Sequence, residues 1–210
     1  MATGPGLHIG DPSDPSLDLT MSDGARPLYD QVRSFIADEV LGLFIAQGSN
    51  SYAEQVTMEE HARQAAALAQ AEGASDAWVL AALLHDIGHF LEEPDSEFGV
   101  TDHGTSGGMW LAERFVEEVS EPVRLHVAAK RYRCFVDPDY QSRLSSASVG
   151  TLHLQGGPMS ADEAETFEAE PYADGALAVR SWDDGGKVDG LDVPSLVAWQ
   201  TLLEDPRFHR

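Results

Sequence analysis

The sequence is poor in cysteine and contains no long apolar run. Cys134 is its only cysteine, which excludes an internal disulfide and a cysteine-based zinc site. No apolar run approaches the roughly 18 residues that cross a bilayer. The first residues have neither the basic start nor the apolar centre of a signal peptide. We therefore expect a cytoplasmic protein that does not bind membranes.

Basic residues are also scarce. The chain has 13 Lys and Arg against 36 Asp and Glu, and its formal net charge is −23 at pH 7. Such a surface repels phosphate backbones and anionic lipids, so we expect no nucleic-acid partner. A basic side chain inside a pocket is then more informative than usual. The composition leaves the oligomeric state open.

The body of the chain predicts an all-α fold. We expect residues 26–210 to form one helical bundle, and residues 1–25, rich in Gly, Pro, Ser and Asp, to be a flexible lead-in. Apolar spacing and capping residues predict helices at 28–48, 57–73, 75–90, 105–119, 121–135, 160–170, 172–188 and 193–204. Residues 91–104 are irregular and acidic, and only residues 150–156 indicate extended structure.

The stretch "LLHDIGHF" at 83–90 combines an apolar helix with ionisable side chains. Burying an unpaired charge is costly, so such groups need partners or a metal ion. On a continuous helix, His85 and His89 would share one face, and Asp86 would point about 100° away. A single core histidine is more often a hydrogen-bonded structural residue than a ligand.

Further histidines and carboxylates strengthen the metal interpretation. Most of them lie within or beside apolar helical segments. Imidazole and carboxylate ligands without a thiolate suit iron, manganese or zinc. The predicted metal ligands are His61, His85, Asp86, His103, His126 and Asp183.

These residues, in this order, resemble the H…HD…D signature of the HD-domain superfamily. That superfamily is a bundle of helices around one or two metals, and most members are phosphohydrolases. With His103 and His126 included, the pattern resembles the dinuclear branch. The resemblance implies that Asp86 bridges two metals. It assigns His61, His85 and Asp183 to one metal, and His103 and His126 to the other.

Five segments resemble a narrower family, the HD-domain mixed-valent diiron oxygenases that cleave organophosphonates. They are "EQVTMEEHARQAA", "AALLHDIGH", "EPVRLHVAAKRY", "LQGGPMS" and "RSWDDGGKV". The resemblance covers roughly residues 50–200. It implies two irons in the Fe(II)/Fe(III) state, with O2 as co-substrate. The implied reaction splits the C–P bond of a small 1-hydroxyphosphonate into a carboxylate and phosphate. Examples of such substrates are 2-amino-1-hydroxyethylphosphonate and its N-methylated analogue.

A phosphonate dianion needs cations or hydrogen-bond donors in a buried pocket. His89, Lys130 and Arg180 each lie one predicted helical turn from a predicted ligand. We expect all three to bind the phosphonate, and we expect His89, Lys130 and the bridging Asp86 to be catalytic. For Lys130 and Arg180 the alternative is a solvated face or a local salt bridge.

Four more substrate contacts follow from the resemblance alone. Ser148 and Gln155 would donate to the phosphonate. Glu54 would contact a substrate amine, and Tyr52 would occupy an iron position before substrate arrives. The alternative for the loop at 51–57 is a helix cap whose aromatic side chain packs on the bundle.

Other functions stay open. A metal-dependent phosphohydrolase could use the same two metals to activate water against a small phosphate ester. An HD-type diiron oxygenase could act on another small hydroxylated substrate. A binding module without catalysis is less favoured, because a scaffold has no need of a full ligand set. The substituent beyond C1 of a phosphonate substrate is not fixed by the sequence.

Overall fold

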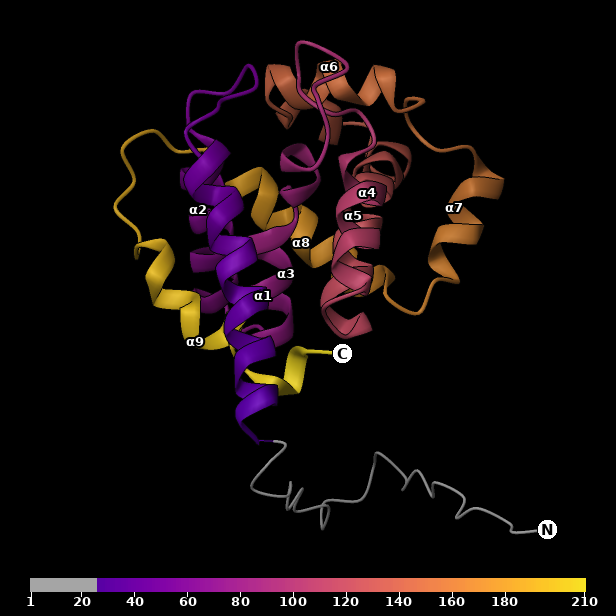
Figure 1. The fold of residues 1–210 in the computed structure, drawn as a ribbon. Helices are drawn as coiled ribbons and strands as arrows, with labels where there is room; N and C mark the ends of the chain where they lie inside the picture. The colour runs from indigo at the N-terminus through magenta and orange to yellow at the C-terminus, as the bar shows by residue number, and fades with distance from the viewer. Residues whose placement is uncertain (1–25) are drawn as a thin grey trace, which may run out of the picture.

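A computed structural model describes residues 26–210, with side chains from residue 35 onward; the lead-in expected at 1–25 lies outside the described residues. This part of the chain is a bundle of helices (Figure 1), with two isolated β-bridges and no strand. The all-α prediction is confirmed. The helices are α1 (Arg26–Gln47), α2 (Met58–Ala71), α3 (Asp76–Leu84), η1 (Ile87–Phe90), α4 (His103–Ala112), α5 (Glu117–Val136), η2 (Tyr140–Arg143), α6 (Ser146–Leu154), α7 (Ala161–Glu168), α8 (Ala173–Gly185), η3 (Leu196–Trp199), α9 (Gln200–Leu203) and η4 (Pro206–Phe208), where η marks a 3-10 helix.

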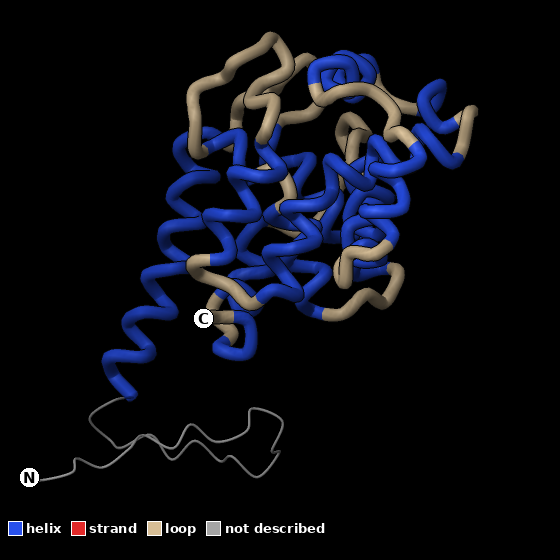
Figure 2. The backbone as a smooth tube through the Cα atoms, turned by 90° about the vertical axis from the view of Figure 1, so that its right-hand side faces the viewer, coloured by secondary structure: helices blue, strands red, loops and turns tan. Residues whose placement is uncertain are grey.

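Helix α3 is the centre of the bundle. It is apolar all round, and Leu80, Leu83 and Leu84 are fully buried. Helices α2, α5 and α8 pack against it, and α4 packs against α5 and η1. Helix α6 lies across one end of the bundle and α7 flanks it (Figure 1), while the first turns of α1 project beyond the other end (Figure 2). Polar side chains on the sides of these helices that face α3 therefore lie inside the bundle.

Capping residues start several helices where the sequence predicts. Glu60 N–H donates to the Thr57 hydroxyl (3.2 Å), and the Glu60 carboxylate accepts from Thr57 N–H (2.8 Å). Ser160 and Glu163 form the same reciprocal pair at α7. Ser75 caps α3 by accepting from the backbone N–H of Trp78. Each cap satisfies helix-end N–H groups that would otherwise lack a partner.

The helix expected at 75–90 is wrong beyond Leu84. The Nδ1 of His85 donates to the carbonyl of Ala82 (2.8 Å) and so takes a helix-end acceptor. Asp86 then has φ −100° and ψ 11°, and the chain continues as the 3-10 turn η1. A Cβ on Gly88 would lie 2.0 Å from the carbonyl oxygen of His103, so this turn touches the backbone of α4 directly. His85 and His89 therefore do not share a helix face.

Two other expectations are also corrected. Residues 150–154 are helical, because Ser145 starts α6 by accepting from Ser148 N–H (3.1 Å); the segment ends in a turn at 155–157. The break expected between residues 119 and 121 does not occur. Helix α5 begins at Glu117 and continues through Pro122, whose missing N–H costs one hydrogen bond near the start of the helix.

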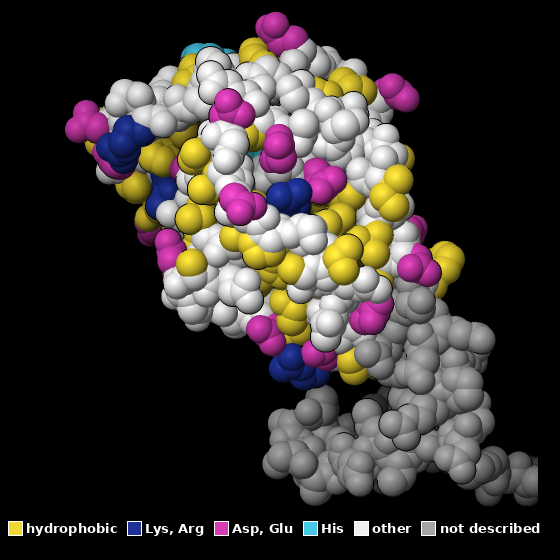
Figure 3. Space-filling model, turned by 90° about the vertical axis from the view of Figure 1, so that its left-hand side faces the viewer, with side chains coloured by type: hydrophobic (Ala, Val, Ile, Leu, Met, Phe, Trp, Pro, Cys, Tyr) yellow, Lys and Arg dark blue, Asp and Glu magenta, His cyan; other side chains and the backbone are white. Residues whose placement is uncertain are grey.

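The surface reflects the acidic composition. One face carries many scattered acidic side chains and few basic ones (Figure 3). Within residues 26–210, no helix combines the length and apolarity that crossing a membrane requires.

Candidate metal centre

The structure brings all six predicted metal ligands together in the middle of the bundle. They come from α2, from the junction of α3 and η1, and from α4, α5 and α8. Their ligand atoms form two groups, each within 4.8 Å: His61, His85 and Asp183, and Asp86, His103 and His126. Five of the six residues are buried, and Asp86 is half-buried. The family resemblance implies the same two groups, with Asp86 shared between them.

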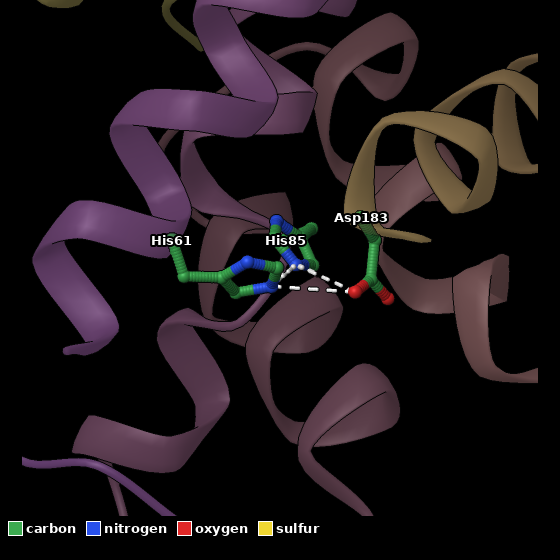
Figure 4. Close-up of side chains that lie close together, drawn as sticks. All are labelled: His61, His85 and Asp183. Carbon is green, nitrogen blue, oxygen red and sulfur yellow. Dashed lines mark hydrogen bonds and ion pairs between the residues drawn. The ribbon is translucent and has the colours of Figure 1, made fainter. Parts of the chain in front are cut away.

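The first group is compact (Figure 4). The Nε2 atoms of His61 and His85 lie 3.0 Å apart, and Asp183 Oδ1 lies 3.3 Å from the Nε2 of His61. In the second group, the Nε2 atoms of His103 and His126 lie 3.2 Å apart. Each group therefore presents two imidazole nitrogens to one point.

Asp86 faces both groups, one oxygen to each. Its Oδ2 lies 3.4 Å from His61 Nε2 and 3.3 Å from His85 Nε2. Its Oδ1 lies 3.4 Å from His103 Nε2 and 3.7 Å from His126 Nε2. This is the arrangement that a carboxylate bridging two metals requires.

Backbone carbonyls fix the tautomers of all four histidines. The Nδ1 atoms of His61, His85, His103 and His126 lie 2.7–2.8 Å from the carbonyls of Gly186, Ala82, Val100 and Val123 respectively. A carbonyl oxygen can only accept, so each Nδ1 carries a hydrogen. In the neutral ring, each Nε2 then points its lone pair at the partner Nε2. A cation between the two lone pairs turns this repulsion into coordination.

The donor set fits a metal ion in spacing and charge. Two ligands at about 2.1 Å from a metal lie about 3.0 Å apart in octahedral and about 3.4 Å apart in tetrahedral geometry. The closest observed separations, 3.0–3.4 Å, match that range. Without metal, a protonated His61 supplies part of the positive charge that the two carboxylates attract, and metal ions would take its place.

The pKa shifts agree with a site that attracts positive charge. Burial alone would raise the pKa of Asp86, but His85 and His61 outweigh it and hold that pKa well below its usual range. Burial opposes ionisation of Asp183 as well, yet Arg180 and Lys187 keep its pKa low. Burial lowers the pKa of His61, but Asp183 and Asp86 overcome this effect and raise it to about 9. Both carboxylates are therefore ionised at neutral pH.

A cavity of about 60 Å³ adjoins both groups. Its wall includes His61, Asp86, His103 and Asp183 from the candidate metal centre. The other polar or aromatic lining residues include Tyr52, Glu54, His89, Lys130, Ser148, Thr151, Arg180 and Lys187. Six of the seven predicted substrate-binding residues therefore reach the cavity.

Lys130 is buried, with 2% of its surface exposed. Its Nζ donates to the Thr151 hydroxyl (2.8 Å), which leaves two of its three hydrogens for another acceptor. Burial, and then the nearby Arg180, lower the pKa of Lys130 from 10.5 to about 7. The ammonium thus lacks a carboxylate partner of its own and would gain from a bound anion.

His89 reaches the cavity from η1 rather than from the face of α3. Its Nδ1 accepts the backbone N–H of Val100 (3.0 Å), so its hydrogen is on Nε2. Its ring stacks on His103 with centroids 4.0 Å apart. Burial, and then the nearby His103, lower its pKa to about 3. His89 is therefore a neutral imidazole with one N–H to donate.

Arg180 is engaged by acidic and phenolic neighbours. Its Nη1 lies 2.6 Å from Asp183 Oδ2, its Nη2 pairs with Asp184, and its Nε donates to the Tyr140 hydroxyl (3.1 Å). Asp183 thus has one oxygen held by Arg180 and the other turned to His61. Arg180 is placed to orient a metal ligand, and its contact with a phosphonate stays a prediction.

Gln155 is the one predicted substrate residue that does not line the cavity. Its amide donates to the carbonyl of Thr101 (2.8 Å). Tyr52 lies at the cavity wall, with its ring centroid 5.2 Å from that of His89. Its predicted role as a resting-state ligand stays a prediction.

Lys187 is a site residue that the sequence reasoning missed. Its Nζ contacts Glu54 Oε1 (2.9 Å), Ser148 Oγ (3.1 Å) and Asp183 Oδ1 (3.3 Å). Burial lowers its pKa, but Asp183 and Glu54 outweigh burial and raise it. Two signals could have identified it. Lys130 and Lys187 are the only lysines in the chain, and Lys187 follows Asp183 by four residues.

The chain is similar to a known domain family and to known phosphonate dioxygenases. The sequence profile of the HD domain matches residues 57–148. Hydroxymethylphosphonate dioxygenase of Gimesia maris is 47% identical over 162 residues, which cover 75% of this chain and 81% of that protein. The 1-hydroxy-2-(trimethylamino)ethyl phosphonate dioxygenase (glycine-betaine-forming) of Leisingera caerulea is 40% identical over 171 residues, covering 77% and 85% respectively.

Proposed function

The chain belongs to the phosphonate-dioxygenase branch of the HD-domain family, and on that premise we propose that it oxidatively cleaves the C–P bond of a small 1-hydroxyphosphonate. The products would be a carboxylate and phosphate. One observation carries the proposal furthest. Both lysines of a strongly acidic chain line a single small cavity, and that cavity also opens onto two groups of candidate metal ligands.

Iron is the metal we propose for both positions. His61, His85, Asp183 and Asp86 Oδ2 would hold one ion, and Asp86 Oδ1, His103 and His126 the other. Zinc has no redox chemistry, so a dioxygenase needs a metal such as iron that does. Bound iron in the proposed mixed Fe(II)/Fe(III) state would supply the electrons for O2 activation. The second group offers fewer protein side chains, so a metal held there would have room to bind substrate.

The protein's own residues would orient the substrate. Lys130 has two free ammonium hydrogens and His89 one N–H, and both side chains line the cavity. Such donors to a charged phosphonate contribute roughly 1.5–3 kcal/mol each. They would hold the phosphonate so that C1 and its hydroxyl face the metals. A fixed orientation removes much of the entropic barrier of the reaction.

The overall reaction balances with one O2 and no further reductant. The C1–P bond breaks and C1 is oxidised to the carboxylate level. One oxygen atom enters the carboxylate, the other enters phosphate, and one proton is released. The carbon and phosphorus centres therefore account for all four electrons that O2 accepts.

A phosphohydrolase is the second candidate, since a two-metal site can also activate water. The relatives favour the oxygenase, because both are named as dioxygenases. A panel assay separates the two functions. Protein reconstituted with Fe, Mn or Zn is given 1-hydroxyphosphonates and matched phosphate monoesters, and phosphate release is followed with and without O2.

We expect phosphate release only from 1-hydroxyphosphonates, only in the presence of O2, and only with a redox-active metal. Faster release from the monoesters, independent of O2, would establish the hydrolase instead. The cytoplasmic location and the exclusion of nucleic-acid and membrane partners stay predictions from composition.

A further inference from the structure

Tyr140 is a buried residue that neither lines the cavity nor belongs to the candidate metal ligands. It lies in η2, outside the five segments that resemble the phosphonate oxygenases. Its hydroxyl donates to Asp184 Oδ2 and accepts from Arg180 Nε (3.1 Å). Burial raises the pKa of Tyr140, so the hydroxyl keeps its hydrogen and remains a donor. One hydroxyl therefore joins two charged side chains of α8.

The Arg180 guanidinium has two further partners, and both are on its own helix. Its Nη1 lies 2.6 Å from Asp183 Oδ2, and its Nη2 pairs with Asp184. Contacts within α8 link that helix to itself, so they do not fix the guanidinium relative to the other helices that carry candidate ligands. Of the three contacts, only the one with Tyr140 comes from another element. Tyr140 therefore holds the guanidinium from outside α8.

The direction of the Arg180 guanidinium matters because of Asp183. Arg180 holds Oδ2 of that carboxylate, while Oδ1 lies 3.3 Å from His61 Nε2 and 3.9 Å from His85 Nε2. A carboxylate that is fixed at one oxygen directs the other oxygen at a metal. Loss of a partner that orients a metal ligand typically lowers metal affinity roughly 10- to 100-fold. The position of Oδ1 in the first group thus depends on Arg180.

The ring of Tyr140 is held independently of its hydroxyl. It packs with buried Cys134 and Leu152 and with half-buried Leu144. The Arg133 guanidinium also lies over the ring, with its Cζ 5.2 Å from the ring centroid. Loss of the hydroxyl alone should therefore leave the ring in place. The polar role of Tyr140 can be tested separately from its packing role.

We infer that Tyr140 is a positioning residue for the metal of the first group, and that it acts through Arg180 to direct Asp183 at that metal. The inference goes beyond the proposed function, since it needs only metal binding at the candidate metal centre. It applies equally whether the bound metals activate O2 or water. Because the hydroxyl contacts Arg180 and Asp184, its effect should be confined to the first group.

The test measures metal affinity at each group separately. His126→Ala keeps the first group complete, and His61→Ala keeps the second group complete. Cobalt(II) is the probe, titrated into metal-free protein against a chelator and followed by its visible absorption. Tyr140→Phe should lower the cobalt affinity at least about threefold in the His126→Ala background. In the His61→Ala background the same substitution should change the affinity by less than that.

Tyr132→Phe is the matched control. The Tyr132 hydroxyl donates to the Glu168 carboxylate (2.7 Å) at the surface, so the control makes the same chemical change away from the metal centre. It should leave the cobalt affinity of both backgrounds unchanged.

A double-mutant cycle tests whether Tyr140 acts through Arg180. Residues that share a partner have non-additive effects. In the His126→Ala background with Arg180→Met added, Tyr140→Phe should therefore have no further effect on cobalt affinity.

Three results would overturn the inference: a smaller loss than threefold at the first group, an equal loss at both groups, or the same effect of Tyr140→Phe with and without Arg180. If circular dichroism shows that Tyr140→Phe does not fold, Asp184→Asn takes its place with the same thresholds, because it removes the charge that holds the Tyr140 hydroxyl and Arg180 Nη2. Turnover plays no part in these titrations. Absence of oxygenase activity would refute the proposed function and leave the role of Tyr140 to be decided by the cobalt affinities.

Discussion

Lys130 gives the sharpest prediction, because its charge should change with pH near neutrality. Burial, and then Arg180, lower its pKa from 10.5 to about 7. In the free protein, about half of Lys130 is charged at pH 7 and roughly one part in a hundred at pH 9. If the ammonium binds the phosphonate, kcat/KM should fall roughly fiftyfold between these pH values, since kcat/KM reports the free enzyme.

The decisive variant is Lys130→Arg, whose guanidinium stays charged throughout this range. The alkaline decline that Lys130 causes should disappear in this variant. Any decline that remains belongs to the substrate or the metal site. Lys130→Met should lose roughly ten- to a hundredfold in kcat/KM at pH 6, where the unaltered lysine is charged. Its iron content should match that of the unaltered protein, because Lys130 is not among the candidate ligands.

The pKa can be measured directly, because the chain has only two lysines. Metal-free protein labelled with 13C at lysine Cε should give two side-chain resonances. One should titrate near pH 7 and the other, from Lys187, above the ordinary value of 10.5. An alkaline limb that is identical in Lys130→Arg, or two lysines that both titrate above pH 10, would refute this reasoning.

The same shift predicts how stability depends on pH. Because the folded-state pKa of Lys130 is depressed, the unfolded chain binds more protons between pH 7 and 10.5. The contribution of Lys130 to the free energy of unfolding should therefore rise with pH across this window, by roughly 5 kcal/mol at most. In Lys130→Met this contribution should be absent, as denaturant titrations of metal-free protein at several pH values can test.

Three further predictions concern the metal centre and its surroundings. Asp86→Ala should lose both metals and His126→Ala mainly one, because Asp86 faces both groups and His126 one; metal analysis that finds equal iron in Asp86→Ala and the unaltered protein would rule out the bridge. Arg180→Met should weaken iron binding at least tenfold without affecting the folded state's helix content, since Arg180 fixes Asp183; unchanged affinity in a chelator competition would count against this role. Gly99→Ala should lower stability by about 1–3 kcal/mol, because φ is 91° and the new Cβ would lie 2.5 Å from the Nδ1 of His89; a denaturation midpoint equal to that of the unaltered protein would contradict it.

Local signals in the sequence were enough to predict the helix class and the convergence of the six candidate ligands. His61, His126 and Asp183 lie on helices packed around α3, so ionisable groups within apolar patterns had to face inward. Capping at Thr57 and Ser160 depends on neighbours three residues away, and those starts were predicted correctly. Such short-range interactions can be predicted from the sequence, because the two interacting residues lie close together in the chain.

The features that were missed depend on partners far apart in the chain. Helix α3 ends at Leu84 partly because Gly88 touches the backbone of His103. The position of Lys187 depends on Glu54, which is 133 residues away. Gln155 turns from the cavity because it finds the carbonyl of Thr101. None of these contacts leaves a periodic pattern, so spacing arguments could not have placed them.

The most direct test of the central claim is the fate of both oxygen atoms of 18O2 during turnover of hydroxymethylphosphonate. The iron-loaded protein is given the substrate in 18O2, and formate and phosphate are analysed by mass spectrometry. Oxidative C–P cleavage predicts one labelled oxygen in each product, one O2 consumed per phosphate, and no phosphate under argon. Unlabelled phosphate released at the same rate under argon would contradict the account.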